Sequence, residues 1–206
     1  MNFRTAVGTH SSDLTCGPTP QVWTGSSDSS KRAVQRPRRY FVKPISARLH
    51  QANSTYSGQP APSSEGTSKL FVYGTLLLND VVNTLLDRIP RCLDARAPGW
   101  QIVRLPYKAY PGLIPGEGEA NGKVFTDLTD AEWATLDAFE DPAYTLAAVR
   151  VLTPLQTDAL TYTWRGEHAG QSWSTAEFGR NELADYLDRC LSWRRRYDQC
   201  CEIDPQ

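Results

Sequence analysis

One carboxylate in the C-terminal half of the chain has neighbours that suit it to proton transfer. Glu140 follows Phe139 at the end of an apolar helical segment that also contains Trp133. A carboxyl group in such surroundings tends to have a raised pKa, which suits an acid–base catalyst near neutral pH. Glutamates also occur at the exposed ends of many helices. At helical spacing Asp137 points away from Phe139, so we expect Asp137 to be solvated.

A second feature that could do chemistry is the segment Tyr73-Gly74-Thr75-Leu76, which follows a short apolar strand. A glycine at the exit of a strand lets backbone N–H groups turn inward together. Such groups can bind a carboxylate or an oxyanion with little reorganisation. A strand followed by glycine is in most proteins only a turn, so this segment alone does not distinguish a binding site from a turn.

Histidines and cysteines limit the other kinds of site. Of three histidines only His168 lies in the part expected to fold, in a Gly166–Gly170 context that predicts an exposed loop. A multi-histidine zinc site is therefore excluded, and a Ser-His-Asp triad or a cysteine enzyme using Cys92 would depend on this one residue. The five cysteines form no C-x-x-C pair and are odd in number, which favours a reducing compartment. We expect Cys92 and Cys190 to be buried apolar residues.

Charge and hydropathy exclude whole classes of partner. The 206 residues contain 22 Lys+Arg and 23 Asp+Glu, a net charge of -1, whereas nucleic-acid binders usually carry a clear basic excess. No apolar run approaches the roughly 18 residues that span a bilayer. We expect no nucleic-acid partner and no membrane association.

Residues 1–68 differ from the rest of the chain. They are rich in Ser and Pro and contain eight basic against three acidic residues, which gives +5. Their sparse apolar residues show no period, so we predict a disordered tail. A basic, Ser-rich, acid-poor leader resembles an organelle transit peptide, but Asp13 falls early and no amphipathic helix opens the chain. We therefore expect a cytoplasmic protein, with organelle import as the alternative.

Residues 69–206 carry signals for three helices. The first is expected to end before Pro90, and the third to end near Arg194–Arg196, where the helix dipole favours cations. The predicted caps are Asn79, Thr129 with Glu132, and Ser174 with Glu177, the last two as capping boxes. The first helix should bury Val81, Val82, Leu85, Leu86 and Ile89.

Strand signals lie between these helices. Apolar runs predict strands at 69–73, 144–152 and 160–164. Short antiparallel strands and hairpins are expected around Pro98-Gly99, Pro106, Pro111-Gly112, Pro115-Gly116 and Asn121-Gly122. The order of elements predicts one α+β domain over 69–206 with a strongly curved or closed sheet.

Four segments, taken together, resemble the gamma-glutamylcyclotransferase-like superfamily, nearest to its plant avirulence-induced-type and gamma-glutamylamine cyclotransferase branch. They are Phe71–Leu76, Tyr110–Pro115, Gly122–Phe125 and Leu128–Tyr144. The resemblance spans about 70–164 and implies a small mixed or antiparallel β-barrel with flanking helices. It also implies a cavity floored by the Tyr-Gly-Thr-Leu segment, with Glu140 as the acid–base residue. Members of this superfamily release 5-oxoproline from gamma-glutamyl compounds and use no cofactor or metal.

The resemblance implies a cyclising acyltransferase. The α-amine of a small gamma-glutamyl substrate would attack its own γ-carbonyl, and Glu140 would take a proton from this amine and give one to the leaving nitrogen. Backbone N–H groups of the segment 74–76 would bind the substrate carboxylate or the oxyanion. The tyrosines would line the cavity, although Tyr73 could equally be a core aromatic with a local partner. The expected substrate-binding residues are Tyr73, Gly74, Thr75, Leu76, Tyr110 and Tyr144.

One residue departs from the superfamily pattern. An arginine often stands two residues after the tyrosine that follows the glutamate, whereas this chain has Leu146 after Tyr144. The departure keeps a second interpretation open, a non-catalytic small-molecule-binding or regulatory module on the same fold. In either case we expect a monomer, and the sequence does not identify the leaving amine.

Overall fold

A computed structural model describes residues 68–202 of the chain. The predictions of a disordered tail and of its role in targeting lie outside the described residues. The described part contains the following elements in order: β1 (Leu70–Val72), a 3-10 turn η2 (Gly74–Leu77), α2 (Asn79–Leu86), β2 (Cys92–Arg104), β3 (Pro111–Phe125), α3 (Asp130–Phe139), β4 (Tyr144–Leu152), β5 (Gln156–Trp164), α4 (Thr175–Asn181) and α5 (Leu183–Glu202).

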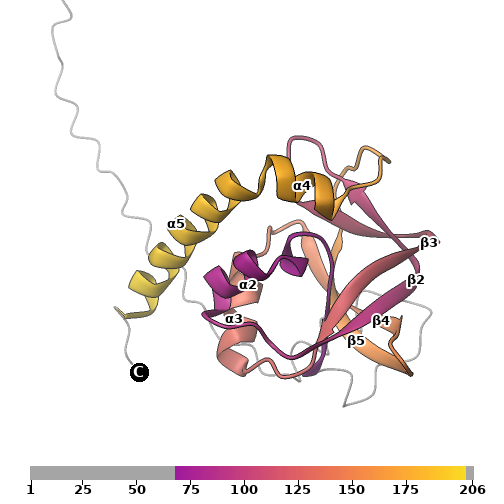
Figure 1. Cartoon of the computed structure of the whole chain (residues 1–206), viewed down its shortest axis with the longest axis horizontal. Helices are drawn as coiled ribbons and strands as arrows, with labels where there is room; N and C mark the ends of the chain where they lie inside the picture. Colours follow the sequence, from indigo (N-terminus) through magenta and orange to yellow (C-terminus); the bar gives the residue numbers. More distant parts are fainter. Residues whose placement is uncertain (1–67, 203–206) are drawn as a thin grey trace, which may run out of the picture. The chain divides into compact units, whose positions relative to one another are not determined.

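The described strands form a closed barrel in the order β1-β3-β2-β4-β5. β1 is parallel to β5, and the other pairs are antiparallel, so the barrel is mixed. Figure 1 shows the helices gathered at one side of the barrel, with α5 running past α2 and α3. The predicted α+β fold with a small barrel and flanking helices is confirmed.

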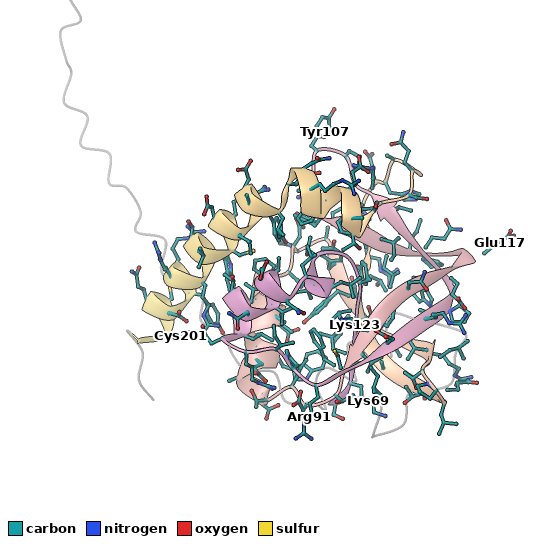
Figure 2. The ribbon with its side chains drawn as sticks, in the orientation of Figure 1. Lys69, Arg91, Tyr107, Glu117, Lys123 and Cys201 are labelled. Carbon is teal, nitrogen blue, oxygen red and sulfur yellow. The ribbon has the colours of Figure 1, made fainter. Side chains whose placement is uncertain are left out.

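After residue 90 the chain forms an antiparallel hairpin, as predicted, but the expectation of several short strands is wrong, because β2 and β3 are long and pair along their whole length. Within residues 92–125 the chain reverses at the turn between β2 and β3, from which Tyr107 projects in Figure 2. Gly116 and Gly122 lie inside β3, where they allow close contact rather than a turn. A Cβ on Gly122 would lie 2.3 Å from the Val72 carbonyl oxygen, and one on Gly116 would lie 2.4 Å from the Gln101 side chain.

The first helix begins and ends differently from the prediction. Leu78 is its N-cap and makes no side-chain cap, so Asn79 is not the cap, and the helix ends at Leu86 with Asp87 in the left-handed conformation. The 3-10 turn runs directly into the helix. The Leu78 carbonyl then accepts hydrogen bonds from the N–H groups of Val81 and Val82. Ile89 lies beyond this end and is 41% exposed.

The second helix, α3, follows its prediction closely. Thr129 and Glu132 form the expected reciprocal capping box, and the last helical residue is Phe139. Glu140 is the C-cap, with extended backbone angles that turn the chain toward β4. The position of Glu140 therefore follows from a helix whose start is determined by its own residues, Thr129 and Glu132.

The C-terminal helix is two helices, and its end was predicted wrongly. Ser174 accepts from the Glu177 N–H, but the Glu177 carboxylate binds Arg104 at 2.6 Å, so only half of the capping box forms. α5 continues to residue 202, beyond the arginines expected at its end. Arg194 instead binds Asp198 and the carbonyl of Leu85 on α2.

The core has a part inside the barrel and a larger part between barrel and helices. The barrel interior includes Phe71, Trp100, Leu113 and Val149. The larger cluster joins β1 and β5 to α2, α3 and α5. Cys190 is buried there as predicted, whereas Cys92 is exposed at the start of β2, which contradicts its prediction. His168 is exposed in a loop, as expected.

No helix among the described residues is both long and apolar enough to cross a bilayer.

Candidate active site

A cavity of about 620 Å³ opens where the end of β1, the start of β3, the end of α3 and one side of α5 meet. Both features singled out in the sequence contribute to it. The cavity wall contains the predicted residues Tyr73, Thr75, Leu76, Tyr110, Glu140 and Tyr144. Gly74, the remaining predicted residue, is not itself part of the wall but packs against Pro111, which is. The structure therefore brings the predicted site residues together from four elements.

Glu140 has the altered acidity that a proton-transfer residue needs. Burial, with a smaller contribution from the nearby charges of Asp137 and Asp141, raises the pKa of Glu140 to about 8. The side chain keeps partial exposure because it faces the open cavity. A group with this pKa is mostly protonated at neutral pH, yet a fraction is ionised.

Asp137 is not the solvated residue that helical spacing predicted. Its Oδ1 accepts a hydrogen bond of 2.7 Å from the hydroxyl of Tyr162 on β5. Helical positions 137 and 140 are three apart, which places both carboxyl groups on adjacent turns of the same side of the helix. Asp137 therefore acts on Glu140 through its charge.

The pKa of Asp141 is shifted in the opposite direction to that of Glu140. Its Oδ2 accepts from Lys108 Nζ and from the Tyr110 hydroxyl, each at 2.7 Å, and its Oδ1 accepts from the Ala143 N–H at 2.9 Å. Burial raises the pKa of Asp141, but these hydrogen bonds outweigh burial and hold it below its usual value. Two adjacent carboxyl groups thus differ in protonation, an arrangement typical of acid–base sites.

Buried Tyr73 and partly buried Tyr144 line the same cavity as Glu140. The Tyr73 hydroxyl donates to the Tyr162 carbonyl at 2.6 Å, and the Tyr144 hydroxyl donates to the Pro111 carbonyl. Burial, above all, raises the pKa of both phenols well above the usual value, so they remain neutral. Tyr73 therefore has the local partner of a core aromatic and is also part of the cavity wall.

The segment after β1 has a shape that only glycine permits. Gly74 has φ 66, and a Cβ there would lie 2.4 Å from Pro111 Cγ. The 3-10 turn starts at this residue, and the first N–H groups of such a turn have no carbonyl partner within it. They can donate to an anion. The hydroxyls of Thr75 and Tyr186 lie 3.4 Å apart, which ties this turn to α5.

Sequence analysis missed several cavity residues. Tyr162 comes from β5, and most of the others lie on α5, whose pattern predicted only an apolar face. The available signal was the recurrence of aromatic and basic residues every three to four positions, which places them along one side of a helix. The α5 residues in the cavity wall are Tyr186, Asp188, Arg189, Cys190, Ser192, Trp193 and Arg196.

Comparisons with known proteins identify a family and several relatives. The profile of a family described as gamma-glutamyl cyclotransferase, AIG2-like, matches residues 70–180. AIG2-like protein C of Arabidopsis thaliana is 33% identical over 132 residues, covering 61% of this chain and 77% of that protein. AIG2-like protein D of the same plant is 35% identical over 114 residues, covering 53% and 75%. A solution structure of an Arabidopsis thaliana protein superposes with a TM-score of 0.47 at 30% identity, covering 67% of this chain and 94% of that one.

Proposed function

Because the chain belongs to the AIG2-like gamma-glutamyl cyclotransferase family, we propose that its cavity converts small gamma-glutamyl compounds into 5-oxoproline by intramolecular aminolysis. The observation that carries this proposal is the position of Glu140. A carboxyl group with a pKa of about 8 lies in the same cavity as the turn that begins at Gly74. The proposal makes the chain a cyclising acyltransferase.

Glu140 acts twice in the proposed reaction. Its ionised form takes a proton from the substrate's α-ammonium group, whose positive charge favours that form once the substrate is bound. The freed amine attacks the γ-carbonyl carbon, and a new C–N bond closes a five-membered ring. The bond from this carbon to the leaving nitrogen then breaks as Glu140 returns the proton to that nitrogen. The ring nitrogen loses a second proton, which passes to the departing amine, so the amine leaves as an ammonium ion. The products are 5-oxoproline and an amine, and no further reactant is needed.

The turn after β1 supplies the anion-binding part of the proposal. The N–H groups of Gly74, Thr75 and Leu76 bind the substrate's α-carboxylate or the oxygen anion that develops on the γ-carbonyl. The neutral hydroxyls of Tyr73, Tyr110 and Tyr144 border the same space. Holding the substrate folded for ring closure supplies several kcal/mol of the barrier reduction.

The test is the activity of Glu140→Gln, which keeps the size of the side chain and removes its titration. Release of 5-oxoproline from gamma-glutamyl amino acids, followed by mass spectrometry, should fall by roughly 10² or more. Glu117→Gln makes the same change on an exposed side chain of β3 (Figure 2) and should leave turnover unchanged. Full turnover by Glu140→Gln with an intact fold would contradict the assignment.

One observation favours a second candidate, a module that binds gamma-glutamyl compounds without turnover. Leu146, at the position where the superfamily often has arginine, is only 3% exposed and packs in the core cluster. If wild-type protein binds such compounds saturably but forms no product, this second candidate replaces the first.

We infer three further properties. The first is that the enzyme acts as a monomer. The described cysteines are all free, with Cys92 and Cys201 exposed, which supports a reducing compartment such as the cytoplasm. We treat residues 69–206 as one domain.

A further inference from the structure

One side of α5 forms the outer part of the cavity wall. Arg189, Ser192 and Arg196 recur at intervals of three and four residues, so they lie along one side of the helix, and all three border the cavity. The family profile ends at residue 180, before this helix begins. The outer wall of the cavity is thus made by a part of the chain that the profile does not cover.

α5 is held in place against the elements that carry the proposed chemistry. Trp193 packs edge-to-face against Phe139, with ring centroids 5.0 Å apart, directly beside Glu140. Arg194 binds the Leu85 carbonyl on α2, and Tyr186 lies against Thr75. The side chains on this helix therefore have a defined position relative to the catalytic carboxyl group.

The cavity is deep enough for the gamma-glutamyl head and the leaving group of a substrate to contact different residues. Thr75 and Leu76 at the floor are each 7% exposed, whereas Arg189 and Arg196 are exposed. The proposed function places the gamma-glutamyl head against the floor. Its leaving group then extends past Glu140 and Phe139 toward α5. The arginines are thus placed to contact the leaving group.

The charges that face this outer part sum to a positive value. Asp141 is paired with Lys108, and burial keeps Glu140 mostly protonated through its raised pKa. The remaining charged groups in the wall are one carboxylate, Asp188, and two arginines, Arg189 and Arg196. Among the residues that the structure describes, neither Arg189 nor Arg196 forms an ion pair with a carboxylate. Arg189 lies over the Tyr186 ring at 5.4 Å and contacts the Asp185 carbonyl.

We infer that Arg189 and Arg196 select substrates whose leaving group carries a carboxylate. This inference rests on the proposed function and narrows its substrate class to gamma-glutamyl amino acids and peptides, over gamma-glutamyl derivatives of neutral or cationic amines. Guanidinium groups suit this task because they offer several N–H donors to a carboxylate and stay charged at all working pH values. Ser192, between them, adds a hydroxyl donor.

The experiment compares substrates that share one head and differ in the leaving group. Gamma-glutamylalanine is compared with gamma-glutamylalaninamide and with gamma-glutamyl-ε-lysine amide, which has a neutral backbone end and a cationic amine. Both kcat/KM for 5-oxoproline release and calorimetric binding to Glu140→Gln are measured. The wild type should prefer the carboxylate by roughly 5- to 20-fold. This preference should shrink at high salt, because exposed charges are screened.

Matched variants identify the residues responsible. Arg189→Gln with Arg196→Gln should reduce the preference to about twofold or less. Arg195→Gln removes the same charge from an exposed position of α5 outside the cavity wall and should keep the preference. An equal loss for all substrates in the double variant would mean that the arginines bind the shared head, which overturns the inference. Lack of a preference in the wild type overturns it as well.

The proposed function can fail separately from this inference. If no substrate yields 5-oxoproline, the cyclising activity is refuted, and calorimetry still shows whether the cavity prefers a carboxylate at its outer end. If 5-oxoproline forms at equal rates from all three compounds, the activity stands and the selective role of the arginines is refuted.

Discussion

Replacing Glu140 by glutamine should make the stability of the protein less dependent on pH. Burial, with the charges of Asp137 and Asp141, raises the pKa of Glu140 from 4.5 to about 8 in the folded protein. Between these values the folded state binds a proton that the unfolded state has released. The corresponding stability is present in full below pH 4.5 and is lost as the pH rises toward 8. Glu140→Gln has no proton to release and avoids this loss.

The size of the effect follows from the same two pKa values. Each pH unit well inside the window costs the wild type up to about 1.4 kcal/mol of unfolding free energy. From pH 5 to pH 7 the wild type should lose about 2.5 kcal/mol relative to Glu140→Gln. This value is a ceiling, because the carboxyl group faces an open cavity and water partly offsets burial. We expect between about 1 and 2.5 kcal/mol.

Urea denaturation at pH 5, 6, 7 and 8 measures this difference directly. The free energy of unfolding is obtained for the wild type, for Glu140→Gln and for the exposed control Glu117→Gln. The difference in unfolding free energy between wild type and Glu140→Gln should grow as the pH rises. The difference between wild type and Glu117→Gln should stay constant. A gap for Glu140→Gln that stays constant within about 0.5 kcal/mol from pH 5 to 8 would refute the raised pKa and the acid–base argument built on it.

Three further changes test the surroundings of the site. Asp137→Asn removes a charge that raises the pKa of Glu140, so the ascending limb of kcat/KM against pH should move from near 8 to lower pH. Gly74→Ala should cost about 2 to 4 kcal/mol in thermal unfolding, because φ is 66 and the added Cβ meets a proline at 2.4 Å. Arg88→Gln removes two hydrogen bonds of 2.5 and 2.7 Å to the capping-box glutamate of α3 and should cost about 1 kcal/mol in urea denaturation.

The changes at Gly74 and Arg88 each have a matched control. Gly170→Ala meets the same left-handed backbone, φ 69, with no atom within 4 Å, so it should cost only about 1 kcal/mol. Equal losses at residues 74 and 170 would contradict the close packing of the turn. Arg91→Gln changes an exposed arginine near the same helix end and should have little effect. An unchanged pH profile for Asp137→Asn would show that its charge does not reach Glu140.

Patterns within a few residues predicted the local structure well. The capping box at Thr129 and the helix it opens form from contacts three and four positions apart, so their residues alone determine them. The placement of Glu140 at the end of that helix follows directly. The second capping box failed because a distant group, Arg104, competes for the Glu177 carboxylate. A local pattern predicts a contact only when no distant partner competes for the same atoms.

Residue types and motif order by themselves determined the class of the fold and singled out the two segments around residues 73–76 and 136–144. Tertiary structure alone decided that Asp137 faces Tyr162, that Gly116 and Gly122 allow close strand contact, and that α5 closes the cavity. The physical reason is distance along the chain. The contact between Thr75 and Tyr186 joins residues 111 positions apart, and only packing of the whole domain decides which of many such pairs meet.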